Sequence, residues 1–288
     1  MNPTKKRWLR FPAEVDQDFL NAVIQDNIDY TFKIASSQQE LFQAFHLLYK
    51  EYRKAGYVTD KPRQILFNQY HLLPETTVFI AKKDGEVLST ASIVYDSTEA
   101  GLPMDCLYRH ELDALRKRNR RILEISSLAS EKSLTGIHVA TNFTRLVFLY
   151  SIFQKVNDIC IMVNPRHVEY YARYFPFTVF GEEKFYPKVN APAVALRVDV
   201  DEVRAFFERT RMIYTLGHQV FRYYLSVKIA INYNIFESIA STCPPCMPST
   251  LLDAASIHRM LSDEPEVLQG LPKRVRRHLM DCYPGLML

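Results

Sequence analysis

Hydrophobic positions near the start of the chain recur first with helical and then with strand spacing. Within residues 38–54, Leu41, Phe45 and Leu48 follow one another at intervals of three or four, which is typical of the apolar face of a helix. A serine pair in front of this segment supplies an N-cap, and a glycine behind it supplies a stop. The pattern predicts a helix over 38–54, preceded by a short strand over 30–34.

Strand patterns follow on both sides of a tight turn. Residues 77–83 and 86–95 flank Asp84 and Gly85, a dipeptide typical of two-residue hairpin turns, so they predict two antiparallel strands. A continuous apolar run over 158–163 predicts a strand that is buried on both faces. The remaining predicted elements are helices over 105–118, 137–157 and 167–175 and strands over 121–129, 177–186 and 193–200.

The order of these elements predicts the fold class. Over residues 30–200 the order is β-α-β-β-α-β-α-β-α-β-β, which predicts an α+β domain with a central mixed, mostly antiparallel sheet flanked by helices. Residues 1–29 are expected to form a leader with a short helix. Residues 201–288 show helical patterns only, and we expect a C-terminal helical extension packed on the domain.

Composition and charge narrow the class of protein. A chain of 288 residues with 48% hydrophobic residues can bury the core of one large domain, with or without an appendage. It has no uncharged apolar stretch of about 18 residues, and its N-terminus lacks the apolar core of a signal peptide, so we expect a soluble cytoplasmic protein without a transmembrane segment. The formal charge of +4 argues against a nucleic-acid-binding protein but allows local basic patches.

The cysteines suggest neither disulfides nor a metal site. They are five in number and scattered, which favours reduced thiols. Cys243 and Cys246 have the spacing of half a zinc site, but no second pair follows them. We therefore expect no metal ligands in this chain.

One segment carries a candidate for chemistry. Residues 121–129 contain a single carboxylate, Glu124, among apolar and small residues. Because alternate residues of a strand share a face, Glu124, Ser126 and Leu128 are predicted to point into the same space. Loss of hydration there would raise the pKa of Glu124 and make it a better acceptor for a proton from an amine. The structural alternative is that Glu124 pairs with a nearby arginine inside the core.

Six motifs in a fixed order point to a known family. They are 52–57 (YRKAGY), 73–79 (LPETTVF), 101–105 (GLPMD), 111–116 (ELDALR), 124–129 (EISSLA) and 163–171 (VNPRHVEYY). Together with the element order, they resemble the N-acetyltransferase fold of the GNAT superfamily. Within it, the chain resembles the long-chain N-acyl amino acid synthases of the FeeM type, relatives of the acyl-homoserine lactone synthases.

The resemblance implies a reaction and its substrates. It implies transfer of a long-chain acyl group from a phosphopantetheine thioester to the α-amine of an amino acid, with no bound cofactor. Common acetyltransferases hold coenzyme A with a glycine-rich loop, whereas residues 130–136 (SEKSLTG) contain one glycine and an acid. This departure favours acyl carrier protein as the donor. Tyrosine is the acceptor that the resemblance suggests, although the residues do not distinguish it from other amino acids.

The resemblance also implies catalytic roles. Glu124 would take the proton of the amine, directly or through a water, and Ser126 would hold the amino acid or a water. Backbone N–H groups near Leu128 or Ala129 would face the thioester oxygen, where the fourth and fifth strands separate to admit pantetheine.

Other residues are assigned to proton return and to binding. Tyr170 or Tyr171 would protonate the leaving thiolate, and the alternative is that both are core aromatics. The residues expected to line the acyl channel are Phe143, Phe148 and Phe207, and those expected to bind the acceptor carboxylate are Arg53 and Arg145. The basic patch expected to contact the carrier protein comprises Arg116, Lys117, Arg118, Arg120 and Arg121, with a solvated helix end as the alternative.

Three competing interpretations remain open at this level. An acyl-homoserine lactone synthase would have an arginine where this chain has Ser127, and an N-terminal tryptophan pattern, whereas the single tryptophan here is Trp8. A non-catalytic module that senses acyl groups or carrier protein would not need to retain Glu124. An ordinary acetyltransferase would use acetyl-coenzyme A without a carrier protein.

Overall fold

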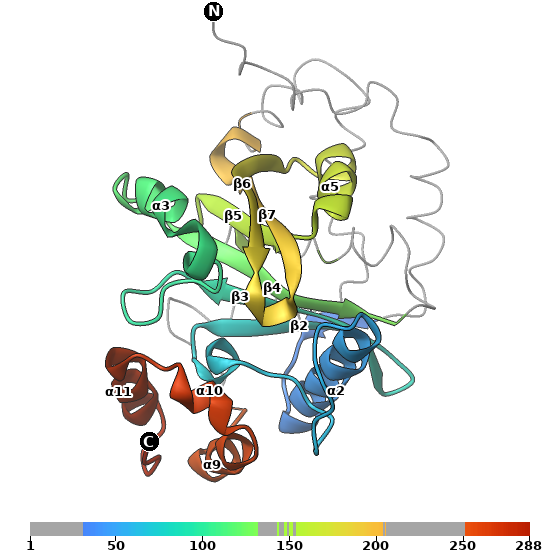
Figure 1. The fold of residues 1–288 in the computed structure, drawn as a ribbon, viewed down its shortest axis with the longest axis vertical. Coiled ribbons are helices and arrows are strands. Elements are labelled where there is room, and N and C mark those ends of the chain that lie inside the picture. The colour runs from blue at the N-terminus through green and yellow to red at the C-terminus, as the bar shows by residue number, and fades with distance from the viewer. Residues whose placement is uncertain are drawn as a thin grey trace, which may run out of the picture.

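The computed structural model describes residues 31–131, 154–203, 205 and 251–288, together with residues 143, 147, 148, 150 and 151 (Figure 1). The described strands form one seven-stranded sheet in the order β1-β2-β3-β4-β5-β7-β6. The strands are β1 (Thr31–Ile34), β2 (Thr76–Lys83), β3 (Glu86–Tyr95), β4 (Ile122–Ser130), β5 (Asp158–Val163), β6 (Thr178–Tyr186) and β7 (Ala191–Asp199). All neighbours pair antiparallel except β4 and β5, which pair parallel. The expected α+β class with a mixed, mostly antiparallel sheet is confirmed.

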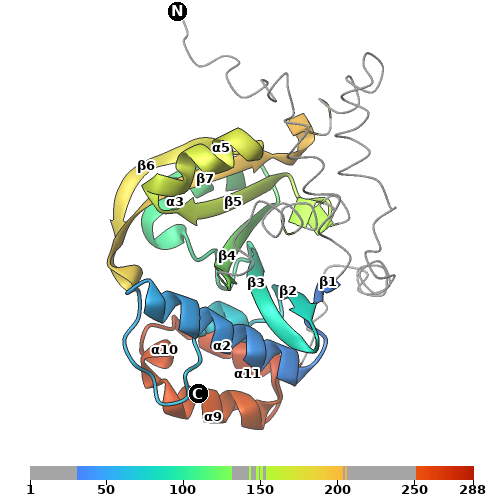
Figure 2. The same cartoon turned by 90° about the vertical axis from the view of Figure 1, so that its right-hand side faces the viewer.

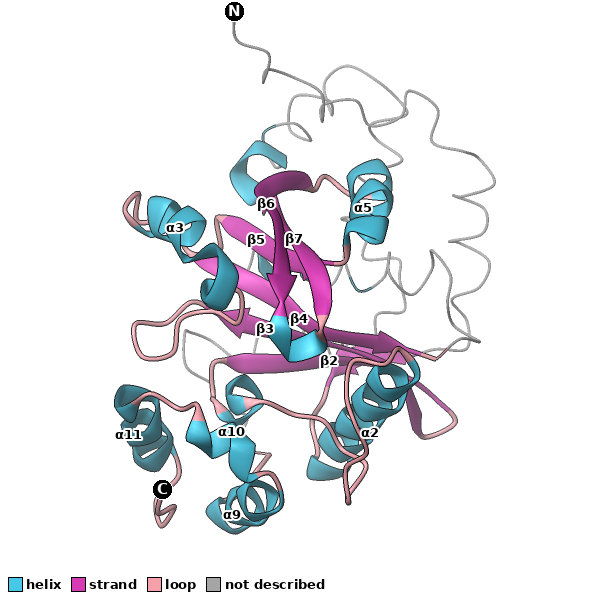
Figure 3. Cartoon of the chain, viewed as in Figure 1, coloured by secondary structure: helices cyan, strands magenta, loops and turns pink. Residues whose placement is uncertain are grey.

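Helices cover both faces of this sheet (Figure 3). The α-helices are α2 (Gln38–Lys54), α3 (Asp105–Arg116), α5 (Val168–Tyr174), α9 (Ala254–Asp263), α10 (Pro265–Gln269) and α11 (Lys273–Cys282), and the 3₁₀ turns are η1 (Gln69–Leu72), η3 (Pro165–His167) and η4 (Pro187–Val189). Helix α2 has the bounds that its periodicity predicts, and the side chain of Ser37 caps it by accepting a hydrogen bond from Glu40 N. In the predicted hairpin turn, Asp84 and Gly85 both have positive φ, 50° and 86°.

Two buried cores lie on opposite faces of the sheet. The first packs α2, η1, α3 and α9–α11 against one face, which we call the α2 face. The second packs α5 and the described part of residues 143–151 against the other, the α5 face. Figure 2 shows α2 beside the C-terminal helices at one end of the molecule and α5 with β5–β7 at the other. The sheet therefore separates two apolar layers of different composition.

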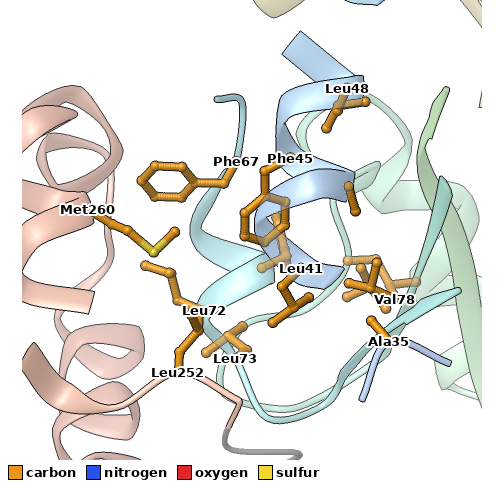
Figure 4. Close-up of a cluster of buried hydrophobic side chains, with 14 of the residues drawn as sticks. Ala35, Leu41, Phe45, Leu48, Phe67, Leu72, Leu73, Val78, Leu252 and Met260 are labelled. Atoms are coloured by element: carbon orange, nitrogen blue, oxygen red, sulfur yellow. The ribbon is translucent and has the colours of Figure 1, made fainter. Parts of the chain in front are cut away.

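The C-terminal helices pack directly on the α2 layer. Leu252 and Met260 lie against Phe67, Leu72 and neighbouring side chains from α2, η1 and the loop between them (Figure 4). No helix among the described residues is long and apolar enough to cross a membrane. The expected leader over 1–29, most of the helix over 137–157 and residues 206–250, with Cys243 and Cys246, lie outside the described residues.

Candidate active site

A cavity of about 1200 Å³ opens where β4 and β5 separate. Its walls come from the end of α2 and the loop over 55–68, from β4, from the end of β5, and from α5, η4 and α10. The parallel ladder between β4 and β5 ends at the pair Ile125–Ile161, although β4 continues to Ser130. The separation of these two strands, expected from the resemblance, is present and gives the cavity access to both faces of the sheet.

A bulge in β4 shapes the cavity wall. Ser127 has a φ of 52°, and the register with β3 gains one residue of β4 between Ser126 and Ala129. Leu128 therefore packs on the α5 face and Ala129 on the α2 face. The expectation that Leu128 shares a face with Glu124 is wrong, because strict alternation fails at a bulge.

The bulge also leaves two residues of β4 without a register partner on either side. These are Ser127 and Leu128, which pair with neither β3 nor β5. Both line the cavity. A bulged backbone at the wall of a cavity can direct N–H groups at a bound carbonyl oxygen.

Glu124 is buried at the wall of this cavity with 1% of its surface exposed. It lies on the α2 face, because its register partners Val94 and Cys160 belong to the core of that face. Its carboxylate accepts a hydrogen bond from Met104 N at 2.8 Å, and within the described residues it has no ion-pair partner. The alternative in which Glu124 pairs with an arginine is therefore not what the described structure shows.

Burial raises the pKa of Glu124 well above its ordinary value of 4.5. The Met104 amide opposes this shift, and the nearby carboxylates of Asp105 and Asp96 add to it. A carboxyl group with a raised pKa is suited to exchanging a proton with an amine near neutral pH.

The turn over 101–105 determines where the Met104 amide points. Gly101 has a φ of 64°, and a side chain there would collide with the carboxylate of Asp105. That carboxylate accepts from Leu102 N at 2.7 Å and pairs with Arg116. The motif over 101–105 thus folds into a fixed turn at the start of α3 and aims one N–H at Glu124.

Several of the residues expected at the site do line the cavity. They are Glu124, Ser126, Leu128, Phe143, Tyr170 and Tyr171. Tyr170 and Tyr171 contact each other edge to face with centroids 5.4 Å apart, and burial raises the pKa of Tyr171. The structure therefore brings the expected base, the bulge and two phenols to one space.

Other expected residues lie elsewhere. Arg53 is exposed, pairs with Asp60 at 2.7 Å and does not line the cavity. Ala129 and Phe148 are buried core residues that do not line it either. Arg145 and Phe207 lie outside the residues whose side chains are described. A polar residue near the end of a helix can direct its side chain in several ways, so the sequence did not show that Arg53 points away from the cavity.

The basic patch over 116–121 also differs from expectation. Arg116 is partly buried and pairs with Asp96, Asp105 and Asp113. Lys117, Arg118 and Arg121 are exposed. The patch precedes Ile122 at the start of β4, whereas the cavity lies along the second half of that strand. The patch as a whole is therefore not a rim of the cavity.

Arg120 likewise has an internal role. It forms an ion pair with the fully buried carboxylate of Asp158 and pairs with Asp199 at 2.9 Å. Asp158 is also paired with Arg197 at 2.5 Å. Two of the five expected carrier-protein contacts, Arg116 and Arg120, thus pair with carboxylates of the domain itself, and in the case of Arg120 one of these carboxylates is fully buried.

His71 lines the cavity and was not expected from the sequence. Its Nδ1 accepts a hydrogen bond from Asn68 N at 3.1 Å, so Nε2 carries the proton and donates to Ser92 Oγ at 3.0 Å. Burial lowers the pKa of His71 to about 4. Ser92 is the register partner of Ser126 on β4. The capping-box spacing from Asn68 to His71 was the one signal that could have indicated this residue.

Phenols and cations from distant segments complete the lining. Tyr52, Tyr57 and Tyr186 line the cavity, and burial raises the pKa of Tyr52 to about 12. Arg166 and Lys188 line it as exposed cations. Tyr52 continues the apolar periodicity of α2 after Leu48, whereas the other four residues belong to no periodic pattern that would have indicated them. No group of three or more His, Cys, Asp or Glu side chains among the described residues is placed to hold a metal ion.

Comparison with known proteins identifies the family. The family model described as N-acyl amino acid synthase FeeM matches residues 43–199, more than half of the chain. This chain belongs to the N-acyl amino acid synthase family. Its structure is similar to that of FeeM, an N-acyl amino acid synthase from uncultured soil microbes, with 27% identity over 61% of this chain and 94% of that one and a TM-score of 0.55.

Two further solved structures are more distantly similar to this synthase. BjaI, a coenzyme A-dependent acyl-homoserine lactone synthase, shows 14% identity over 64% of this chain and 91% of that one, with a TM-score of 0.49. LasI, also an acyl-homoserine lactone synthase, shows 15% identity over 59% and 89%, with a TM-score of 0.44. No curated protein sequence matches the chain.

Family membership gives the class of reaction. The chain is an acyltransferase with the GNAT fold, as the resemblance implied. The turn over 101–105, the bulge of β4 and both tyrosines of α5 all lie within the matched residues, whereas α9–α11 lie outside them.

Proposed function

We propose that this synthase transfers a long-chain fatty acyl group from the thioester of an acyl carrier protein to the α-amine of an amino acid, tyrosine in particular. The product would be an N-acyl amino acid. The observation that supports this most strongly is Glu124, a buried carboxyl with a raised pKa and no cationic partner among the described residues, at the gap between β4 and β5.

The two faces of the sheet suggest where each substrate lies. Glu124 is on the α2 face, so the amine that gives up a proton would approach from that side. Leu128 and Phe143 line the cavity and belong to the core of the α5 face, which suits an apolar chain. The reacting thioester would then sit in the gap itself, with the amino acid on one face and the acyl chain on the other.

The proposed reaction combines proton transfers with the exchange of a C–S bond for a C–N bond. Glu124 takes a proton from the ammonium, and the free amine attacks the thioester carbon to form the C–N bond. The N–H groups of the bulge at Ser127 and Leu128 meet the negative charge on the thioester oxygen. The C–S bond then breaks, and the nitrogen loses its second proton as the amide forms. The thiolate takes a proton from a phenol of α5, Tyr170 or Tyr171, or from the protonated Glu124. The second proton of the nitrogen restores that donor, and the other proton leaves to solvent.

The cations of the cavity suit the anionic parts of the substrates. Lys188 lies two residues after Tyr186, whose raised pKa reflects burial together with neighbours that include Glu124. We assign Lys188 to the acceptor carboxylate, which replaces the earlier expectation for Arg53. Arg166 follows the end of β5 at the gap and suits the phosphate of pantetheine.

Two features favour a carrier protein and an aromatic amino acid. Glu131, next to the cavity end of β4, pairs with Lys50, so an acid occupies the start of the segment that binds pyrophosphate in coenzyme A enzymes. On the α2 face the lining includes Tyr52, Leu66 and Phe67, a surface that suits an aromatic side chain.

The experiment is mass spectrometry of lipid extracts from cells that express the protein or its Glu124→Gln variant. We expect long-chain N-acyl amino acids, N-acyl tyrosine among them, only with the unaltered protein. Purified enzyme is then given acyl carrier protein or coenzyme A thioesters, with tyrosine or S-adenosylmethionine as acceptor. Equal turnover with the coenzyme A thioester, or lactone formation from S-adenosylmethionine, would overturn the proposal.

A further inference from the structure

The C-terminal helices contribute a wall of the cavity, although they lie outside the residues that the family model matches. Glu266, Val267 and Gly270, at and just after α10, line the cavity together with Glu124 and the loop over 55–68. Val267 packs in the core of the α2 face, the side on which Glu124 lies. This wall therefore faces the space that the proposed function gives to the amino acid.

Ion pairs fix α10 against the loop over 55–68, which also lines the cavity. Lys61, which lines the cavity, pairs with the buried carboxylate of Glu264 and with Glu266 at 3.0 Å. Arg63 pairs with Asp263 at 2.6 Å. Because Lys61 and Glu264 are both largely buried, this contact is far less screened than a surface pair. The position of α10 is thus set by the loop that shares the cavity with it.

Gly270 is an exposed residue of this wall that lines the cavity without a side chain. A side chain added there would meet no other atom within 4 Å, and the residue has a φ of −87°, which any amino acid can adopt. A larger residue would therefore project into open space without strain in the backbone.

We propose that α10 forms the acceptor wall of this synthase, and that Gly270 sets how large an amino-acid side chain the cavity admits. The inference rests on the proposed function and adds to it a specificity-determining residue. It predicts that filling the space beside Gly270 excludes large acceptors and spares small ones.

The test compares Gly270→Phe with Gln269→Phe. Gln269 is exposed, as Gly270 is, but it does not line the cavity, so Gln269→Phe makes the same apolar addition outside the site. Initial rates are measured for each protein with one acyl donor and with alanine, leucine, tyrosine and tryptophan. We expect Gly270→Phe to raise KM about tenfold or more for tyrosine and tryptophan, with kcat and the values for alanine little changed. Gln269→Phe should match the unaltered enzyme.

Three outcomes would overturn the inference. They are an unchanged profile for Gly270→Phe, an equal loss for all acceptors, or an equal effect of Gln269→Phe. Thermal unfolding of both variants excludes misfolding as the cause. If the unaltered enzyme acylates no amino acid, the proposed function fails first, and calorimetric titration of tyrosine into the unaltered protein and Gly270→Phe tests the wall without turnover. Equal affinity of the two proteins would then contradict the proposal.

Discussion

Two buried acids near the start of β4 differ in their partners. Beside Ile122, Arg120 and Arg197 surround the buried carboxylate of Asp158. Two residues further along, Glu124 is buried at the wall of the cavity with only a backbone amide as its hydrogen-bond donor among the described residues. Both carboxyl groups are buried, but only Asp158 is paired with cations.

This difference separates structural from chemical use of an acid. A buried carboxylate enclosed by arginines stays ionised and holds strands together. A buried carboxyl without a cation has a raised pKa and can exchange a proton. In the ladder, Glu124 still has a partner on both sides, and β4 loses its partner on β5 after the next residue, Ile125. The acid without a cation therefore lies directly before the point where the two strands separate.

The largest expected effect comes from removing the unpaired acid. Glu124→Gln should lower turnover by about 10² to 10⁴, because a glutamine cannot take the proton of the amine. It should also raise thermal stability. The folded protein holds the Glu124 proton at pH values where the unfolded chain has released it, so burial of this group costs stability as the pH rises above 4.5.

Melting temperatures of the unaltered protein and of Glu124→Gln, measured between pH 5 and pH 8, check the expected gain in stability. The gain from Glu124→Gln should grow with pH. A variant that loses activity and is also less stable at pH 8 would show that Glu124 serves the fold, as Asp158 does.

Removal of the paired acid, Asp158, should lower stability and leave activity unchanged. Asp158→Asn leaves Arg120 and Arg197 without their common buried partner, and we expect the free energy of unfolding to fall by about 3 kcal/mol. The KM values of the folded enzyme should not change. Urea unfolding measures the loss, with Asp60→Asn, in an exposed pair with Arg53, as a control that should show no change. A change in KM without a loss of stability would contradict the structural role.

His71 should make the stability of the protein depend on pH in the acidic range. Because burial lowers its pKa to about 4, neutral His71 contributes stability above the unfolded value of 6.5, and this contribution is lost as the pH falls toward 4. The expected loss is about 2 kcal/mol at pH 5. In His71→Asn, urea unfolding between pH 7 and pH 5 should depend less on pH than in the unaltered protein. An unchanged dependence would mean that other groups cause it.

The smallest expected effect on stability concerns the bulge. Ser127 has a positive φ, so Ser127→Gly should keep stability and activity, whereas Ser127→Val should lose about 1 kcal/mol and most turnover. The physical reason is that a β-branched residue resists this backbone conformation, and moving it displaces the N–H groups of the bulge. Equal activity of the two variants would show that the bulge amides do not meet the thioester oxygen.

The sequence by itself determined the elements and the residue of greatest chemical interest. Periodicity gave the bounds of α2, and the Asp84–Gly85 turn gave the β2–β3 hairpin, because both depend on interactions between near neighbours. Glu124 was apparent because an acid among apolar strand residues contradicts the local pattern. The motifs from residue 52 to residue 171 were sufficient to identify the family.

Only the tertiary structure decided which side chains share the cavity. The bulge at Ser127 depends on the register with β3, so the face of Leu128 was not available from alternation. Arg116 and Arg120 looked like a docking patch because their carboxylate partners are distant in sequence or lie on neighbouring turns and strands. His71, Lys188 and the α10 wall reach the site from segments far from β4. Such contacts depend on how the elements pack against one another, and a local sequence pattern does not predict that packing.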